Sequence, residues 1–156
     1  MRRSSRLVAA LLGAASLAAC QSAAPAPPTA GPAHNAGDVA FVEALIPHHR
    51  AGIELAEQVA EQPDRQVLAD AIISTERDEI SRMTGWLTTW GVTLSPASKT
   101  APGKGDPVKA LAAHQEEAVA LAQKEQAQGS NQAALAFAKQ IIESRTAEAA
   151  ELRSAQ

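Results

Sequence analysis

Two short stretches of the chain combine residue types that could bind a metal ion or form a buried polar network. In the first stretch, an advance of about 100° per residue along a helix places His48 and His49 on either side of the centre of the apolar face. In the second, the same construction places Glu79 in the middle of the apolar face and Glu76 beside it. Two imidazoles and two carboxylates are therefore predicted to point into one small helical core.

A buried carboxylate without a partner costs several kcal/mol, so it either takes up a proton or pairs with a cation. Glu76 and Glu79 are about one helical turn apart, close enough to share an ion, and Met83 could add a thioether. This donor set suits Zn, Fe, Mn or Cu(II) better than Cu(I), and imidazole ligation should weaken below about pH 6. The alternative is a hydrogen-bonded Glu–His network without metal. The residues alone leave both interpretations open.

The elements that carry these residues are all predicted to be helices, because the apolar residues repeat at helical spacing and nowhere alternate as in a strand. We expect the first helix to be capped by Asp38 and to run to about Gln62, with a kink or restart at Pro47. The second helix is expected to follow a cap at Asp64 and to end at Gly91.

The second half repeats this plan. Asp106-Pro107 predicts a cap and first turn, a helix to about Gln128 follows, and Gly129-Ser130-Asn131 separates it from a fourth helix that reaches about Arg153. Two tandem helical hairpins, at 38–91 and 106–153 and joined by a loop at 92–105, predict an all-α, up-down four-helix bundle domain over 38–156.

An alignment of the two halves of the sequence shows what the second half lacks. His114-Gln115 aligns with His48-His49, and Arg145 and Glu148 fall where the first half has its two glutamates. Arg145 and Glu148 are three residues apart and can pair, as in a site replaced by a salt bridge. We therefore expect His114 to be structural and the metal site, if present, to lie within the first half. Glu116 and Glu117 are expected to be solvated surface residues.

The N-terminus has the features of an export signal. Arginines precede a short apolar run over residues 7–19, and Leu17-Ala18-Ala19-Cys20 matches the bacterial lipobox, in which the cysteine is lipidated. Residues 1–19 are thus expected to be a lipoprotein signal peptide. Residues 20–37, from the lipidated Cys20 onward, are rich in Ala and Pro and are expected to be a flexible tether in which His34 is solvated.

Composition excludes several classes of function. Removal of the signal leaves 137 of the 156 residues, with 11 basic against 17 acidic side chains, so nucleic-acid binding is not expected. Cys20 is the only cysteine, so no internal disulfide can form. No activated nucleophile is evident, and the Glu-x-x-His pairs of di-iron oxidases are missing, so an enzyme is not expected.

The motifs resemble those of a known family, the bacterial domain of unknown function 305, which is grouped with ferritin-like four-helix bundles. The residues that carry the resemblance are Phe41, Leu45-Ile46-Pro47-His48-His49, Gly52-Ile53, Leu55-Ala56, Ala69, Ile72-Ile73, Glu76, Glu79-Ile80, Met83, Trp86-Leu87 and Trp90-Gly91. The resemblance implies an exported, often lipid-anchored protein, with copper binding or copper tolerance implicated in some members. It implies His48, His49 and Met83 as ligands, with Glu79 nearby.

The chain also departs from the family pattern. Leu45 and Leu55 stand where methionine is common, and Met83 is the only methionine left after removal of the signal. This favours either an ion harder than Cu(I) or no bound ion.

We accordingly expect a lipid-anchored metal-binding protein on the extracytoplasmic face of the cell membrane, buffering or handing on copper or another divalent transition metal. The alternative function is a non-catalytic structural or interaction module whose His/Glu cluster is a core network. The sequence leaves open a homo-oligomer and a metal-transfer partner.

Overall fold

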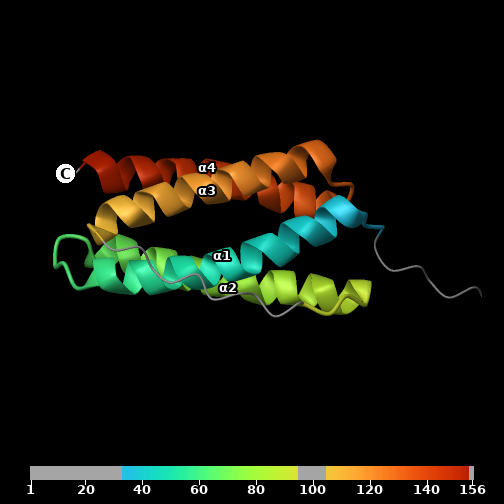
Figure 1. Ribbon diagram of the computed structural model, residues 1–156, viewed down its shortest axis with the longest axis horizontal. Coiled ribbons are helices and arrows are strands. Elements are labelled where there is room, and N and C mark those ends of the chain that lie inside the picture. The colour runs from blue at the N-terminus through green and yellow to red at the C-terminus, as the bar shows by residue number, and fades with distance from the viewer. Residues whose placement is uncertain (1–32, 95–104, 155–156) are drawn as a thin grey trace, which may run out of the picture.

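The computed structural model describes residues 33–94 and 105–154. These residues form four helices, which are α1 (Ala36–Ala60), α2 (Gln66–Trp90), α3 (Pro107–Gln128) and α4 (Gln132–Ser154) (Figure 1). The predicted all-α bundle of two helical hairpins is confirmed. The predicted signal peptide, Cys20 and most of the tether lie outside the described residues.

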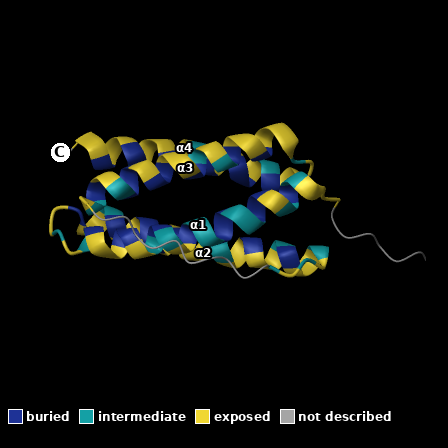
Figure 2. Cartoon of the chain, viewed as in Figure 1, coloured by how far each residue is buried: buried dark blue, intermediate teal, exposed yellow. Residues whose placement is uncertain are grey.

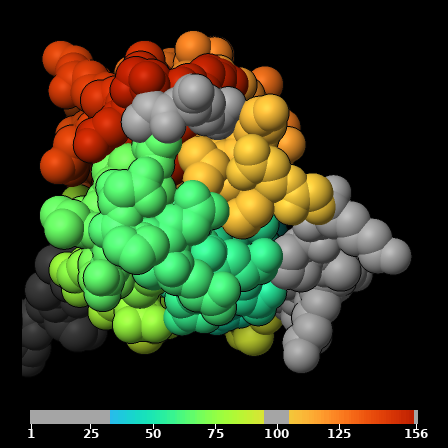
Figure 3. Space-filling view, turned by 90° about the vertical axis from the view of Figure 1, so that its left-hand side faces the viewer, coloured from blue at the N-terminus to red at the C-terminus, as the bar shows by residue number. Residues whose placement is uncertain are grey.

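The two hairpins are arranged so that α1 packs against both α2 and α3, and α3 packs against α4. Figure 3 shows one end of the molecule, where the turn between α1 and α2, the start of α3 and the end of α4 come together. Thus α2 and α3 both start at this end and run parallel, so the predicted up-down order holds within each hairpin but not from the first hairpin to the second (Figure 1). Such a bundle needs one long crossover connection, as ferritin-like folds have.

The connection between α2 and α3 is long enough for that crossover. A helix of 25 residues such as α2 is about 37 Å long. The residues between Trp90 and Pro107 can span roughly 50 Å when extended. The ferritin-like topology therefore depends on the length of this connection.

The predicted caps of α1 and α2 are both wrong. The α1 cap is Asn35, whose Oδ1 accepts hydrogen bonds from the amides of Gly37 (2.7 Å) and Asp38 (3.0 Å). Asp38 is the third helical residue instead, and it completes a capping box by accepting from the Asn35 amide (2.6 Å). The cap position of α2 is Arg65 rather than Asp64, and it makes no side-chain capping bond.

The other predicted ends are confirmed. Gly91 ends α2 in the left-handed conformation with φ of 69°, which glycine adopts without steric cost. Asp106 caps α3 by accepting from the Val108 amide (2.9 Å). Asn131 likewise accepts from two amides of the first turn of α4. The predicted restart at Pro47 does not occur, because α1 is continuous through that residue.

The buried faces of the helices point toward one another (Figure 2) and form two separate hydrophobic clusters. The first cluster includes Phe41, Leu45, Met83, Leu87 and Phe137. The second includes Leu55, Val59, Ile72, Leu111 and Leu152. In each helix, buried polar residues occupy the interval between the two clusters, so a polar layer crosses the middle of the bundle.

Within the described residues, none of the helices is both long and apolar enough to cross a membrane.

Candidate metal centre and buried ion-pair network

The polar layer contains two distinct groups of side chains. One is an ion-pair network around Arg145 on α4, and the other is a pair of histidines, one from α1 and one from α3, with an exposed glutamate beside them. The sequence predicted one group. The structure divides it because His48 and His49, as neighbours on a helix, point in directions about 100° apart.

Arg145 is completely buried and its guanidinium is shared among three carboxylates. It pairs with Glu148 on its own helix (Nη1–Oε1 3.0 Å) and, through Nη2, with Glu79 on α2. Its Nε lies 3.9 Å from Oε1 of Glu76. Gln115 on α3 closes the network by donating to Glu148 (2.8 Å). A network of this kind ties α2, α3 and α4 together.

His49 belongs to this network. Its side chain is fully buried, and its Nε2 lies 2.8 Å from Oε2 of Glu79. Burial lowers the pKa of His49, against the opposing effect of the Glu79 carboxylate. The carboxylate of Glu79 therefore interacts with both the His49 ring and the Arg145 guanidinium.

Glu76 is also fully buried, but the structure gives neither of its oxygens a hydrogen-bond partner. Burial raises the pKa of Glu76 to about 8, although the Arg145 charge acts in the other direction. This raised pKa favours the protonated form of Glu76, and uptake of a proton is one of the two outcomes expected for a carboxylate buried in this core.

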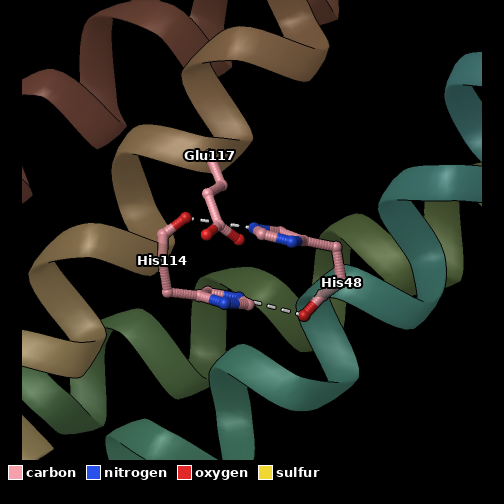
Figure 4. Close-up of side chains that lie close together, drawn as sticks. All are labelled: His48, His114 and Glu117. Atoms are coloured by element: carbon pink, nitrogen blue, oxygen red, sulfur yellow. Dashed lines mark hydrogen bonds between the residues drawn. The ribbon is translucent and has the colours of Figure 1, made fainter. Parts of the chain in front are cut away.

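His48 and His114 form the second group, in which the two rings stack face to face across the α1–α3 interface (Figure 4). Their centroids are 3.6 Å apart and their planes differ by 3°. The Nε2 of each ring lies close to the backbone carbonyl of the other residue, at 3.1 Å from His48 and 3.0 Å from His114. A carbonyl oxygen only accepts, so both Nε2 atoms must carry hydrogen.

In this tautomer the lone pair of each neutral ring is on Nδ1, so ligation of a metal by these rings would use Nδ1. Burial lowers the pKa of His48 to about 3 and that of His114 to about 4. Both rings are therefore neutral well below pH 6, and the predicted loss of metal affinity near that pH should occur only in stronger acid.

Glu117, one turn after His114 on α3, completes a group of three potential ligands. Ligand atoms of His48, His114 and Glu117 all lie within 4.8 Å of one another. Figure 4 shows the Glu117 carboxylate beside the stacked rings. Two neutral imidazoles and an exposed carboxylate form a nitrogen and oxygen donor set that fits a borderline divalent ion. The ligand atoms come from both hairpins.

Gly52 allows this close packing. A Cβ atom at this position would lie 2.4 Å from Oε2 of Glu76 and 2.8 Å from Nε2 of His114. Any larger residue would therefore displace His114, Glu76 or both. This lack of space for a Cβ atom is the physical reason for a glycine at position 52 of the motif.

The structure separates the residues that were predicted to share one site. His49, Glu76 and Glu79 lie around Arg145, whereas His48 stacks on His114. Met83 is fully buried in the first hydrophobic cluster. Arg145 pairs with Glu148 as predicted, and it also binds the carboxylate of Glu79 in the other hairpin.

Sequence reasoning favoured a structural role for His114, left open whether it contributes to the site, and treated Glu117 as a surface residue. The signal was present in the alignment of the two halves, where His114 stands in register with His48. Two residues in register in two antiparallel hairpins can meet at the interface, as they do here. His34, predicted to be solvated, is exposed and also stacks on Trp90 at 4.8 Å.

Comparison with known families supports the resemblance that the sequence predicted. The model described as "Domain of unknown function (DUF305)" matches residues 38–110, which hold α1, α2 and the start of α3. The predicted family resemblance is thereby confirmed. A search among curated proteins found no match.

Several solved structures share the fold. CopM in the Cu(II)-bound form matches with a TM-score of 0.68 and 22% identity over 75% of this chain and 93% of that one. CopM in the Ag-bound form, obtained by soaking, gives 0.66 and 25% identity over 75% and 92%. A DUF305 fragment from Deinococcus radiodurans gives 0.66 and 20% identity over 80% and 97%. These descriptions name metal-bound states and a domain, not an enzyme.

Proposed function

We propose that this chain, whose residues 38–110 match the model of the domain of unknown function 305, binds a transition metal between the two hairpins through His48, His114 and Glu117. The metal is cargo, and the protein buffers it or hands it on. The observation that carries this proposal is the convergence of three ligand atoms within 4.8 Å across the α1–α3 interface. The copper- and silver-bound forms of CopM support it through a shared fold.

The donor set favours particular ions. Imidazole nitrogen and carboxylate oxygen suit Cu(II) or Zn(II), whereas Cu(I) and Ag(I) prefer sulfur. Met83 is fully buried among the apolar side chains of the first cluster and is not one of the three grouped ligands. We therefore expect Cu(II) and Zn(II) to bind more tightly than Ag(I).

A second function has its own supporting observation. The Arg145 network already supplies His49, Glu79 and Glu148 with oppositely charged or polar partners. A guanidinium cannot ligate a metal and repels one nearby. This part of the polar layer therefore acts as a structural core network. The alternative function, a structural role for the His/Glu cluster, thus fits His49, Glu79 and Glu148.

The first prediction concerns the ligands. Calorimetric titration with Cu(II) and Zn(II) should give about one site per chain, and His48→Ala and His114→Ala should each weaken binding by a factor of ten or more. Glu117→Gln should weaken it less, because its carboxylate is exposed and can be replaced by water. His34→Ala is the matched control, since it removes an exposed histidine outside the group.

The same titration separates this proposal from the sequence interpretation. Loss of binding in His48→Ala with full retention in His114→Ala would contradict a site between the hairpins. It would return the ligands to the first hairpin, with His49, Glu76, Glu79 and Met83.

The proposed location is the extracytoplasmic face of the cell membrane, through a lipid on Cys20. The lipobox sequence supports it. A tethered bundle with an interhelical metal site is suited to intercepting metal ions outside the cytoplasm.

A further inference from the structure

A second pair of buried carboxyl groups lies away from the polar layer, where α1 begins and α3 ends. Asp38 is 0% exposed and Glu125 is 1% exposed. Oδ1 of Asp38 accepts from the amides of Ser130 (3.0 Å) and Asn131 (2.9 Å). Its Oδ2 accepts from the amide of Asn35 (2.6 Å) and the hydroxyl of Ser130 (3.1 Å). One carboxylate thus joins the start of the first hairpin to the turn of the second.

Glu125 lies next to this carboxylate, because its carboxyl group packs against Gly129 while Asp38 binds the following residue, Ser130. Both of its oxygens are buried, and neither has a hydrogen-bond donor among the described residues. Its side chain is held against the turn, where a Cβ on Gly129 would lie 2.2 Å from Oε1. Two carboxylates only accept, so a hydrogen bond between Glu125 and Asp38 requires a proton on one of them.

The hydrogen bonds decide which group carries the proton. Four donors already stabilise the charged form of Asp38, and although burial acts against them, its pKa falls to about 2. Burial, together with the neighbouring Asp38, raises the pKa of Glu125 to about 8.

A bound cation is a poorer explanation than a proton. Each Asp38 oxygen already has two donors, which occupy its lone pairs. The charged group of α1 that interacts with Glu125 is Asp38. The first turn of α4 contains no acidic residue that could serve as a further ligand for a cation. Glu125 and its neighbour on α3, Lys124, both line a cavity of about 30 Å³, so the cation already next to Glu125 is a lysine side chain.

We propose that Glu125 donates a carboxyl proton to Asp38, and that this shared proton clamps the start of α1 to the α3–α4 turn. The clamp links the two hairpins at one end of the bundle, and a rise in pH releases it. The proposal does not depend on metal binding.

The test compares wild type with Glu125→Gln, which keeps the shape and a hydrogen-bond donor but cannot ionise. Between about pH 4.5 and 8, the raised pKa means that Glu125 carries a proton in the folded state but not in the unfolded chain. The contribution of Glu125 to the free energy of unfolding is therefore complete below about pH 4.5 and is lost as the pH rises toward 8. The urea midpoint of the wild type should therefore fall relative to that of Glu125→Gln between pH 5 and 8, by on the order of 1 M, and the difference should then level off.

The difference between the two proteins cancels the contributions of other titrating groups, including Glu76. Glu61→Gln, at an exposed position, is the control and should follow the wild type at every pH. Carboxyl ¹³C NMR should give Glu125 a midpoint near pH 8, with the Ser130 amide shift following it. A midpoint below pH 5.5, or a midpoint difference that is constant from pH 5 to 9, would overturn the proposal.

Discussion

At the scale of single residues, neighbouring positions in the sequence have different partners and hence different chemistry. His48 is one residue from His49, yet His48 keeps a free Nδ1 beside His114, while His49 is held by Glu79. What distinguishes them is the side chain opposite each one in the bundle. Glu79, which also pairs with Arg145, lies opposite His49, whereas the ring of His114 lies opposite His48.

Arg145→Ala should destabilise the protein by about 3–5 kcal/mol, because it leaves the buried carboxylate of Glu79 and the half-buried carboxylate of Glu148 without their cation. Urea unfolding at pH 7 measures this. Arg77→Ala is the control, since it breaks the exposed pair with Glu57 and should cost less than about 1 kcal/mol. Equal losses in the two variants would contradict a buried network.

Acid should destabilise the fold through the stacked histidines. The pKa of His48 is lowered to about 3 and that of His114 to about 4, so below pH 6.5 the unfolded chain binds protons that the folded chain excludes. Stability is therefore complete above pH 6.5 and falls with decreasing pH, by about 1.4 kcal/mol per pH unit for each ring. Between pH 7 and 5, the loss in His114→Gln should be about 2 kcal/mol smaller than in wild type. The same loss in both proteins would show that His114 is not buried in its neutral form.

At the scale of the helices, a glycine determines how closely side chains from α2 and α3 approach α1. Gly52 lies against Glu76 of α2 and His114 of α3, where a Cβ atom has no room. By contrast, Gly85 on α2 has nothing within 4 Å of an added Cβ. Both glycines lie within helices, but Gly52 is enclosed by neighbouring side chains and Gly85 has open space beside it.

Gly52→Ala should therefore weaken metal binding at least tenfold and lower stability, because His114 or Glu76 must move. Gly85→Ala should leave metal binding unchanged and stabilise the protein by up to about 1 kcal/mol, through the higher helix propensity of alanine. Calorimetry and urea unfolding of both variants test this. Unchanged metal binding in Gly52→Ala would mean that His114 does not need its observed position.

At the scale of the whole molecule, the two hairpins are joined at several levels of the bundle. The stacked histidines and the Arg145–Glu79 pair join them in the polar layer, and Asp38 joins them at one end. A metal bound at the stacked histidines would add a further link. It would stabilise the folded state by about 2.7 kcal/mol at a free metal concentration of 100 times Kd.

The N-terminal anchor should be separable from this bundle. Cys20→Ser should release the protein from the membrane fraction without changing its urea midpoint, because the described helices begin only at Ala36. Fractionation followed by immunoblotting measures the release. If Cys20→Ser stayed in the membrane fraction, the lipobox assignment would be wrong.

The sequence by itself determined the number of helices, the two hairpins and most helix ends, because helical periodicity and caps such as Gly91, Asp106 and Asn131 act locally. It also identified His48, His49, Glu76 and Glu79 as inward-facing polar residues. Tertiary structure alone decided which of them meet. Helical spacing fixes the face a residue occupies, but the parallel course of α2 and α3 determines what lies opposite. For that reason His48 faces His114, and Arg145 reaches Glu79 in the other hairpin.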